Sequence, residues 1–216
     1  MRQIFKVKQV PQMSWSSPSP YNLRPRFLTF FYLNFGLALF GLGEAILIAS
    51  GAGVSPWTVL ADGISGKTGW SIGFSTMIIS FAILALWIPL RQKPGMGTIL
   101  NALIIAFMID FSLPYLPHPD QLAWQLVQAA VGVFIVGLSS GIYLAANLGP
   151  GPRDGLMTGL QRVTDIPIAW VRIAIEVAAV ASGWYLGGAV GVGTLMFAFG
   201  VGPCVAIGIL LVRRFL

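Results

Sequence analysis

The residues best suited to hold a charged solute lie in a segment rich in glycine and proline in the second half of the chain. Residues 149–152 read Gly-Pro-Gly-Pro and are followed directly by an arginine and an aspartate. Proline suits the first turn of a helix and glycines permit a sharp turn before it, so we expect a short helix to begin here. The free N–H groups and positive dipole end of a helix attract anions. The predicted substrate-binding residues are Gly149, Gly151, Pro152, Arg153, Asp154 and Gly155.

A matching segment in the first half predicts a second short helix. It contributes Pro56, Trp57 and Thr58 to the same predicted binding site, and Trp57-Thr58 corresponds to Arg153-Asp154. An arginine and an aspartate beside a helix start could hold both charges of a zwitterion, or they could cap the helix and mark the cytoplasmic face of a membrane. Each short segment has about ten residues, or ~15 Å of helix, which is half of a hydrocarbon core. We expect these helices to be re-entrant; the alternative is an amphipathic helix lying at the membrane interface.

Three ionisable residues fall inside apolar segments, where charges are costly and usually face a bundle interior or a cavity. Arg172 and Glu176 are four residues apart, so they can pair on one face of a helix. Glu44 lies deep in the first apolar segment. We expect all three to act in coupling or gating, with Glu44 able to take up protons. A structural ion pair and a hydrogen bond to a neighbouring helix are the alternatives.

The sequence shows no pattern typical of catalysis or of a metal or cofactor site. Residues 63–66 and 137–141 match serine-nucleophile patterns, but a serine needs a base, and the one histidine, His118, lies in a proline-rich loop. The single cysteine, Cys204, excludes an intramolecular disulfide framework and a zinc site with paired cysteines. We therefore expect a protein that is not an enzyme and that has no catalytic residues, no cofactor and no metal.

The composition is that of a membrane protein. Hydrophobic residues make up 56% of the 216 residues and charged residues only 9%, against about 25% charged in a soluble domain. A spanning helix needs about 20 apolar residues. This predicts an all-α polytopic membrane protein in contact with the lipid bilayer, with six transmembrane helices at residues 29–50, 72–90, 98–113, 121–146, 167–186 and 194–212.

The basic residues predict the orientation, because cytoplasmic loops carry an excess of Lys and Arg. With the N-terminus inside, eleven of the 13 Lys and Arg residues fall in inside segments, whereas Lys67 falls outside and Arg172 within the fifth span. Both termini are therefore expected in the cytoplasm. Residues 1–28 are expected to form an unstructured basic tail that contains Ser and Pro. Despite the net charge of +6, the basic residues form no stripe with aromatics, so no nucleic acid partner is expected.

The two halves of the chain are related by an internal repeat. At a fixed offset of 96 residues, Gly53 meets Gly149, Pro56 meets Pro152 and Thr68 meets Thr164, without a gap. The expected units are residues 29–120 and 121–216, each with three spans. Because three is odd, the second unit must enter the membrane from the opposite side. This predicts two inverted three-helix repeats, each with one short broken or re-entrant helix.

Two strings in these short segments resemble a known family. Residues 145–156 read AANLGPGPRDGL and residues 55–60 read SPWTVL, and in both the chain resembles the YczE/YyaS/YitT family of bacterial membrane proteins over roughly residues 30–212. It is most similar to the YczE branch, since it lacks the soluble C-terminal domain of YitT-type members. The resemblance implies a bacterial cytoplasmic (inner) membrane location and carries no biochemical activity with it.

Together these features favour a secondary transporter or permease for a small anionic or zwitterionic solute, bound between the two broken segments. The rival is a non-transporting membrane scaffold or regulator that assists a partner. That rival predicts a bundle without a central polar cavity. The glycine content also permits a homodimer.

Overall fold

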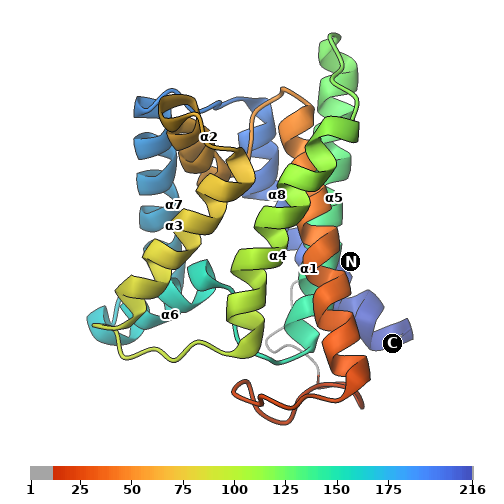
Figure 1. Cartoon of the computed structure of the whole chain (residues 1–216), viewed down its shortest axis with the longest axis vertical. Coiled ribbons are helices and arrows are strands. Elements are labelled where there is room, and N and C mark those ends of the chain that lie inside the picture. Colours follow the sequence, from red (N-terminus) through yellow and green to blue (C-terminus); the bar gives the residue numbers. More distant parts are fainter. Residues whose placement is uncertain (1–11, 216) are drawn as a thin grey trace.

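The computed structural model of the protein describes residues 12–215, and all regular secondary structure in this part of the chain is helical (Figure 1). A 3-10 turn, Leu113–Tyr115, continues the fourth helix. In chain order the α-helices are α1 Phe27–Ala49, α2 Pro56–Thr68, α3 Ile72–Trp87, α4 Met96–Ser112, α5 Leu122–Ala145, α6 Pro152–Thr164, α7 Ile168–Tyr185 and α8 Val192–Phe215.

Five of these helices are long and apolar enough to cross a membrane. They are α1, α4 with its 3-10 extension, α5, α7 and α8. A sixth span arises only if α2 and α3 count as one, and the chain bends by 116° between them. Alone, α3 has 16 residues, or ~24 Å of helix. The expected number of six spans therefore depends on α3, which is shorter than the segment 72–90 predicted for it.

The local backbone repeats at the spacing seen in the sequence. Helices α2, α3 and α4 begin at residues 56, 72 and 96, and α6, α7 and α8 begin 96 residues later. A positive φ is uncommon outside glycine, yet every described residue that has one belongs to a pair at this spacing. The pairs are Gly51 and Asn147, Gly53 and Gly149, Gly69 and Asp165, and Arg91 and Gly187.

Corresponding helices run in opposite directions. In Figure 1, α1 and α4 ascend, whereas their counterparts α5 and α8 descend; α3 descends and α7 ascends. The short helices lie at opposite ends of the bundle, α2 at the top and α6 at the bottom. An inverted repeat requires this arrangement.

The two halves are interlocked, because each short helix packs against a long helix of the other half. Helix α2 packs along α7, and α6 packs along α3. The other long helices form a second group in which α5 lies between α1 and α8. Gly137 and Gly141 of α5 lie directly against Cys204 and Gly208 of α8, with no room for a larger side chain. These glycines are therefore used inside the chain, and the homodimer stays a prediction.

The turns before the short helices are held by the first residues of α4 and α8. Gly97 N–H donates to the carbonyl of Leu148 at 2.7 Å, and Gly193 N–H donates to that of Ala52 at 2.8 Å. These two bonds are also equivalent under the 96-residue offset. The turn of each half is thus fixed by a helix of the other half.

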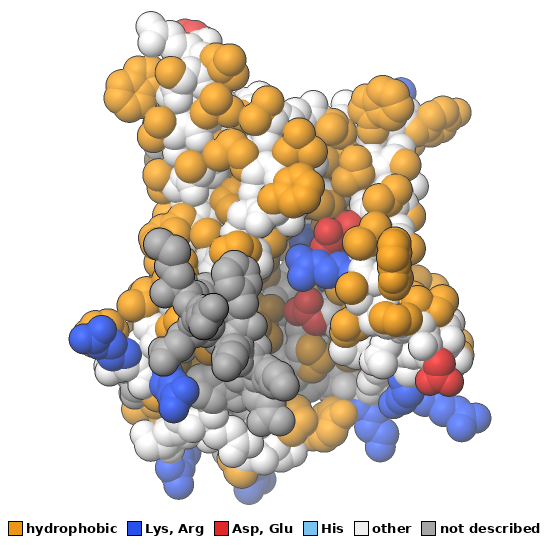
Figure 2. Space-filling view, turned by 180° about the vertical axis from the view of Figure 1, so that it is seen from behind, with side chains coloured by type: hydrophobic (Ala, Val, Ile, Leu, Met, Phe, Trp, Pro, Cys, Tyr) orange, Lys and Arg blue, Asp and Glu red, His pale blue; other side chains and the backbone are white. Residues whose placement is uncertain are grey.

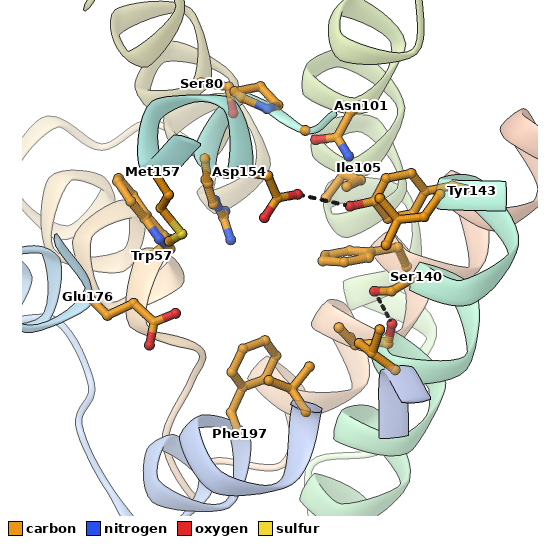
Figure 3. A pocket seen from close by; sticks show the side chains of 18 of the residues that line it. Trp57, Ser80, Asn101, Ile105, Ser140, Tyr143, Asp154, Met157, Glu176 and Phe197 are labelled. Atoms are coloured by element: carbon orange, nitrogen blue, oxygen red, sulfur yellow. Dashed lines mark hydrogen bonds between the residues drawn. The ribbon is translucent and has the colours of Figure 1, made fainter. Parts of the chain in front are cut away.

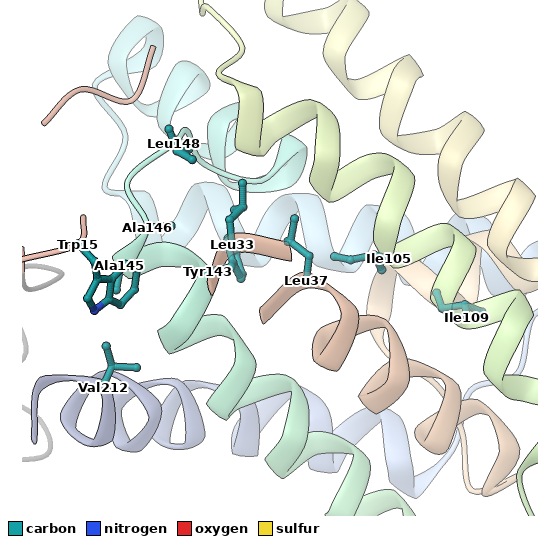
Figure 4. Close-up of a cluster of buried hydrophobic side chains, with 10 residues drawn as sticks. All are labelled: Trp15, Leu33, Leu37, Ile105, Ile109, Tyr143, Ala145, Ala146, Leu148 and Val212. Atoms are coloured by element: carbon teal, nitrogen blue, oxygen red, sulfur yellow. The ribbon is translucent and has the colours of Figure 1, made fainter. Parts of the chain in front are cut away.

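The segment before α1 is folded, so the expectation of an unstructured tail was wrong for residues 12–26. Trp15 is only 3% exposed and packs in a buried cluster with Leu33, Tyr143 and Val212 (Figure 4). Its carbonyl accepts a hydrogen bond from the Thr29 hydroxyl. The segment is rich in Ser and Pro, and this composition gave no indication that Trp15 would anchor it to the helices. Residues 1–11, including Arg2, Lys6 and Lys8, lie outside the described part.

Candidate functional site

A cavity of about 420 Å³ lies at the centre of the bundle, and all eight helices contribute to its wall. Its volume falls in the range of small-molecule sites, about 300–1,000 Å³. Figure 3 shows the labelled side chains arranged around the open space. The polar residues that line it are Trp57, Thr76, Ser80, Asn101, Ser140, Tyr143, Arg153, Asp154, Arg172 and Glu176.

Equivalent positions of the two halves face each other across this cavity. The lining contains six pairs at the 96-residue offset: Phe40 and Val136, Trp57 and Arg153, Thr76 and Arg172, Ser80 and Glu176, Asn101 and Phe197, and Ile105 and Val201. The cavity therefore lies between the two halves of the chain. All four charged side chains in the lining belong to the second half of the chain. The equivalent positions in the first half carry neutral residues.

Arg153 is the cation at the centre of the site. Its guanidinium lies 5.4 Å from the centre of the Trp57 ring, within the range of a cation–π contact. Since these two residues occupy equivalent positions, their contact lies where the two halves meet. No described residue accepts a hydrogen bond from this guanidinium, although Glu44, Asp154 and Glu176 interact with it electrostatically. Its N–H donors are therefore available to an anion.

Asp154 places a carboxylate in the same cavity (Figure 3). It accepts one long hydrogen bond, from the Tyr143 hydroxyl at 3.3 Å. Asp154 has a large exposed surface area, and this surface faces the cavity that the residue lines. A cationic side chain that can bind an anion and an anionic side chain that can bind a cation thus lie on successive residues of the first turn of α6.

The first turn of α6 is positioned by packing against α3. The Trp87 indole N–H donates to the carbonyl of Pro152 at 3.0 Å, and Gly155 lies flat against the same ring. Gly149, with a φ of 109°, fits against Gly95 and Thr98. Of the predicted binding residues, Gly149 and Gly155 therefore shape the backbone, and neither lines the cavity.

The remaining predicted binding residues divide in the same way. Gly151, Pro152, Arg153, Asp154 and Trp57 line the cavity, whereas Pro56 and Thr58 do not. The Thr58 side chain is directed to Glu44 instead.

Arg172 and Glu176 form the predicted ion pair on α7. The Nε of Arg172 donates to Oε1 of Glu176 at 2.8 Å, and both residues line the cavity. Their side chains are 48% and 21% exposed. A second pocket between α6 and α7 shares Arg172, Asp154 and Met157 with the central cavity, so these residues lie where the two spaces meet.

Glu44 lies behind the cavity wall and is 1% exposed. The hydroxyls of Ser55 and Thr58 both lie 2.9 Å from its Oε2 and 2.8 Å from each other. Its Oε1 has no hydrogen-bond partner among the described residues. Three oxygen atoms thus make three short contacts, for which the two hydroxyls supply only two protons.

Several cavity residues were not predicted from the sequence. Asn101, Tyr143, Thr76 and Ser80 were not among the predicted binding residues. A hydroxyl or aromatic residue within an apolar helix is common and marks no site by itself. The 96-residue offset would have found two of them, because Thr76 and Ser80 are the counterparts of Arg172 and Glu176.

Comparison with known proteins places the chain in a family. Residues 27–209 match the family of unknown function DUF6198. The chain belongs to this family. It is 35% identical over 209 residues to an uncharacterised protein of Haemophilus influenzae, covering 97% of this chain and 95% of that protein. No solved structure matches the chain.

The resemblance to YczE and YyaS is confirmed. The uncharacterised membrane protein YczE of Bacillus subtilis is 31% identical over 176 residues, covering 79% of each chain. The uncharacterised protein YyaS of the same organism is 27% identical over 173 residues, covering 78% of this chain and 86% of YyaS. Together with the five long apolar helices, this identifies a multi-pass membrane protein in contact with the lipid bilayer.

Proposed function

We propose that the DUF6198 member described here is a secondary transporter or permease for a small anionic or zwitterionic solute. The observation that carries the proposal is the central cavity, which is walled by all eight helices and holds two cationic and two anionic side chains. Such groups are expensive inside a bilayer and are retained where they face a water-filled or ligand-filled space. We assign no catalytic step to this site.

In this proposal the membrane is crossed six times, by α1, α3, α4, α5, α7 and α8. Residues 29–120 and 121–216 form two inverted repeats, supported by the opposite directions of equivalent helices (Figure 1). Helices α2 and α6 enter from opposite sides as half-helices, and their first turns meet at the Trp57–Arg153 contact. Secondary transporters often bind substrate where such broken helices converge near the midplane.

The distribution of charge supports cytoplasmic termini in a bacterial inner membrane. In Figure 2 most basic side chains lie at the lower end of the molecule, which is the end where α1 begins and α8 ends in Figure 1. These lower basic residues include Arg24, Arg91, Arg162 and Arg213, whereas Lys67 lies in the last turn of α2 at the other end. The lower end is the cytoplasmic face by the positive-inside rule.

The binding chemistry follows from the first turn of α6. The free guanidinium of Arg153 would bind a carboxylate or phosphate, with geometry suited to two hydrogen bonds. Asp154 would bind an ammonium group, and Tyr143 orients it. The cavity holds equal numbers of positive and negative side chains, so a zwitterion leaves no net charge buried.

Glu44 supports proton coupling, and the Arg172–Glu176 pair supports gating. A proton on the Glu44 carboxyl would supply the third hydrogen for its three short contacts with Ser55 and Thr58. Thr58 adjoins Trp57, which stacks on Arg153, so loss of this proton is coupled to the binding site through one helix turn. The Arg172–Glu176 pair on α7 lies where the central cavity meets the second pocket. Separation of this ion pair would admit solute.

The rival function, a non-transporting scaffold, predicted a bundle without a central polar cavity. The cavity and its inward charges favour transport over that rival.

The experiment is uptake into proteoliposomes, with solutes first selected from a panel of small zwitterions and anions by thermal stabilisation of the purified protein. Arg153→Ala and Asp154→Asn should each weaken binding of the selected solute, and reduce its uptake, by about tenfold or more. Arg162→Ala removes a charge from the same helix, outside the cavity, where it bonds the Leu90 carbonyl, and should leave uptake unchanged. Activity that survives both cavity substitutions would refute the assigned roles.

A further inference from the structure

The central cavity is closed on one side of the molecule and open on the equivalent side. Helices α3 and α4 pack along each other, whereas their counterparts α7 and α8 do not pack together in the described structure. Helix α7 is held by α2 and α6 instead. This difference breaks the symmetry of the two halves. It leaves a lateral opening between α7 and α8, which Figure 2 shows as a hollow with basic and acidic side chains inside it.

The lateral opening lies in the part of the molecular surface that is covered by hydrophobic side chains. Exposed apolar side chains adjoin the lining residues in both helices: Ile173 and Val177 follow Arg172 and Glu176 in α7, and Leu195 and Phe199 precede Gly202 by about two turns and one turn in α8. Figure 2 shows hydrophobic side chains above and beside the hollow. A small hydrophilic solute does not travel through this layer, because it would leave its water behind. A molecule that enters here needs an apolar part.

The two edges of the lateral opening differ in chemistry. The α7 edge carries Arg172 and Glu176, and the α8 edge carries Phe197, Val201 and Val205. Between these apolar residues is Gly202, at which an added Cβ would have no atom within 4 Å. There is thus unfilled space along an apolar wall that starts at a charged site and ends at the lipid.

We propose that the ligand is a single-chain amphiphile with a zwitterionic or anionic headgroup. Its head binds Arg153 and Asp154, and its chain follows the α8 wall past Gly202 into the bilayer. The cavity of about 420 Å³ accommodates a headgroup while the chain remains in the lateral opening. This inference rests on the proposed transport function and narrows its substrate class.

The test uses radiolabelled lysophosphatidylethanolamine, which has a phosphate for Arg153 and a primary ammonium for Asp154 on one acyl chain. It is bound to the purified protein in maltoside micelles and displaced by glycerophosphoethanolamine, the same headgroup without the chain. Binding should be saturable, with the bare headgroup at least about tenfold weaker as a competitor. Arg153→Ala should weaken both by about tenfold or more.

The blocking variant is Gly202→Trp, which places a ring in the lateral opening at a position where an added Cβ has no atom within 4 Å. It should weaken lysolipid binding by about tenfold and leave headgroup binding unchanged. Gly66→Trp is the matched control, because Gly66 also has no neighbour within 4 Å and does not line the cavity. Val205→Trp is a second blocking variant should Gly202→Trp fail to fold.

The outcomes separate this inference from the general proposal. If the bare headgroup competes as well as the lysolipid and Arg153→Ala abolishes both, the amphiphile is refuted and a small-solute transporter stands. If neither binds the wild-type protein, both ideas fail for this headgroup chemistry. A disulfide between two Gly202→Cys copies in the membrane would show that a second copy covers the opening, which also refutes the amphiphile.

The source of the amphiphile is identified by mass spectrometry of co-purified lipid. Lysolipid retained by the wild-type protein and absent from Gly202→Trp indicates capture from the bilayer. Binding only after addition to the micelles indicates an amphiphile delivered from solution. Either result supports the lateral route.

Discussion

Replacing Glu44 with glutamine tests whether this buried carboxyl carries a proton in the folded protein. The side chain is 1% exposed and meets the Ser55 and Thr58 hydroxyls at 2.9 Å each. Glutamine has almost the same shape and the charge of the protonated acid. If Glu44 is protonated, Glu44→Gln exchanges one neutral hydrogen-bonding group for another, and the free energy of unfolding should change by less than about 1 kcal/mol.

An ionised Glu44 predicts a different magnitude. Each hydrogen bond to a charged group contributes about 1.5–3 kcal/mol. Glutamine keeps neutral hydrogen bonds of about 0.5–1.5 kcal/mol at both contacts, so loss of the charge would cost about 1–1.5 kcal/mol per contact, or about 2–3 kcal/mol in all. Glu44→Ala should cost about 2–5 kcal/mol in either case, because it leaves a cavity and removes the carboxyl partner of the two hydroxyls. The comparison of glutamine with alanine therefore separates charge from packing.

Unfolding in mixed micelles gives these free energies, and infrared spectroscopy gives the protonation directly. The wild-type protein at neutral pH should show the C=O stretch of a protonated carboxyl, and Glu44→Gln should lose it. Glu176→Gln is the control, because Glu176 is paired with Arg172 at 2.8 Å and should contribute no such band. No difference in the band between wild type and Glu44→Gln, together with a loss of more than about 2 kcal/mol, would refute the reasoning.

Other predictions concern packing and the binding site. Gly137→Leu should separate α5 from α8 and prevent folding or cost about 3 kcal/mol or more, measured by unfolding in micelles, because the α8 backbone around Cys204 leaves no room for a side chain; wild-type stability would contradict the tight packing. Trp15→Ala should cost about 3–5 kcal/mol in the same assay, since the ring is 3% exposed; a loss under about 1 kcal/mol would mean that this segment does not anchor the fold. Tyr143→Phe should weaken ligand binding by about three- to tenfold without altering the fold, because it removes one long hydrogen bond to Asp154; unchanged binding in a titration would exclude Tyr143 from orienting that carboxylate.

Much of the fold could be predicted from the sequence because the repeat has no gaps. The starts of the short helices at Pro56 and Pro152, and the turns at Gly53 and Gly149, follow from proline and glycine geometry. The folded segment around Trp15 could not be predicted in this way. Its position depends on a surface to which α1, α5 and α8 contribute, and no local pattern marks that surface.

The sequence predicted the candidate site mainly through its charged residues. Arg153 and Arg172 stand out in an apolar chain, and both line the cavity. Tyr143 and Asn101 do not stand out, since a single aromatic or amide residue in a spanning helix usually packs or bonds a neighbour. The lateral opening left no trace in the sequence at all. It results from the lack of extensive packing between α7 and α8, and apolar residues such as Val201 look the same whether they face a helix, a lipid or a cavity.

The central claim, that the first turn of α6 lies in a transport pathway, is tested most directly by thiol labelling of Met157→Cys in a Cys204→Ala background. Met157 lines both the central cavity and the adjoining pocket. A membrane-impermeant maleimide is applied separately to right-side-out and inside-out vesicles, with Lys67→Cys and Arg162→Cys as controls for the two faces. Labelling of Met157→Cys from both sides is the predicted result. Labelling from the cytoplasmic side alone would contradict it and would make α6 an interfacial helix.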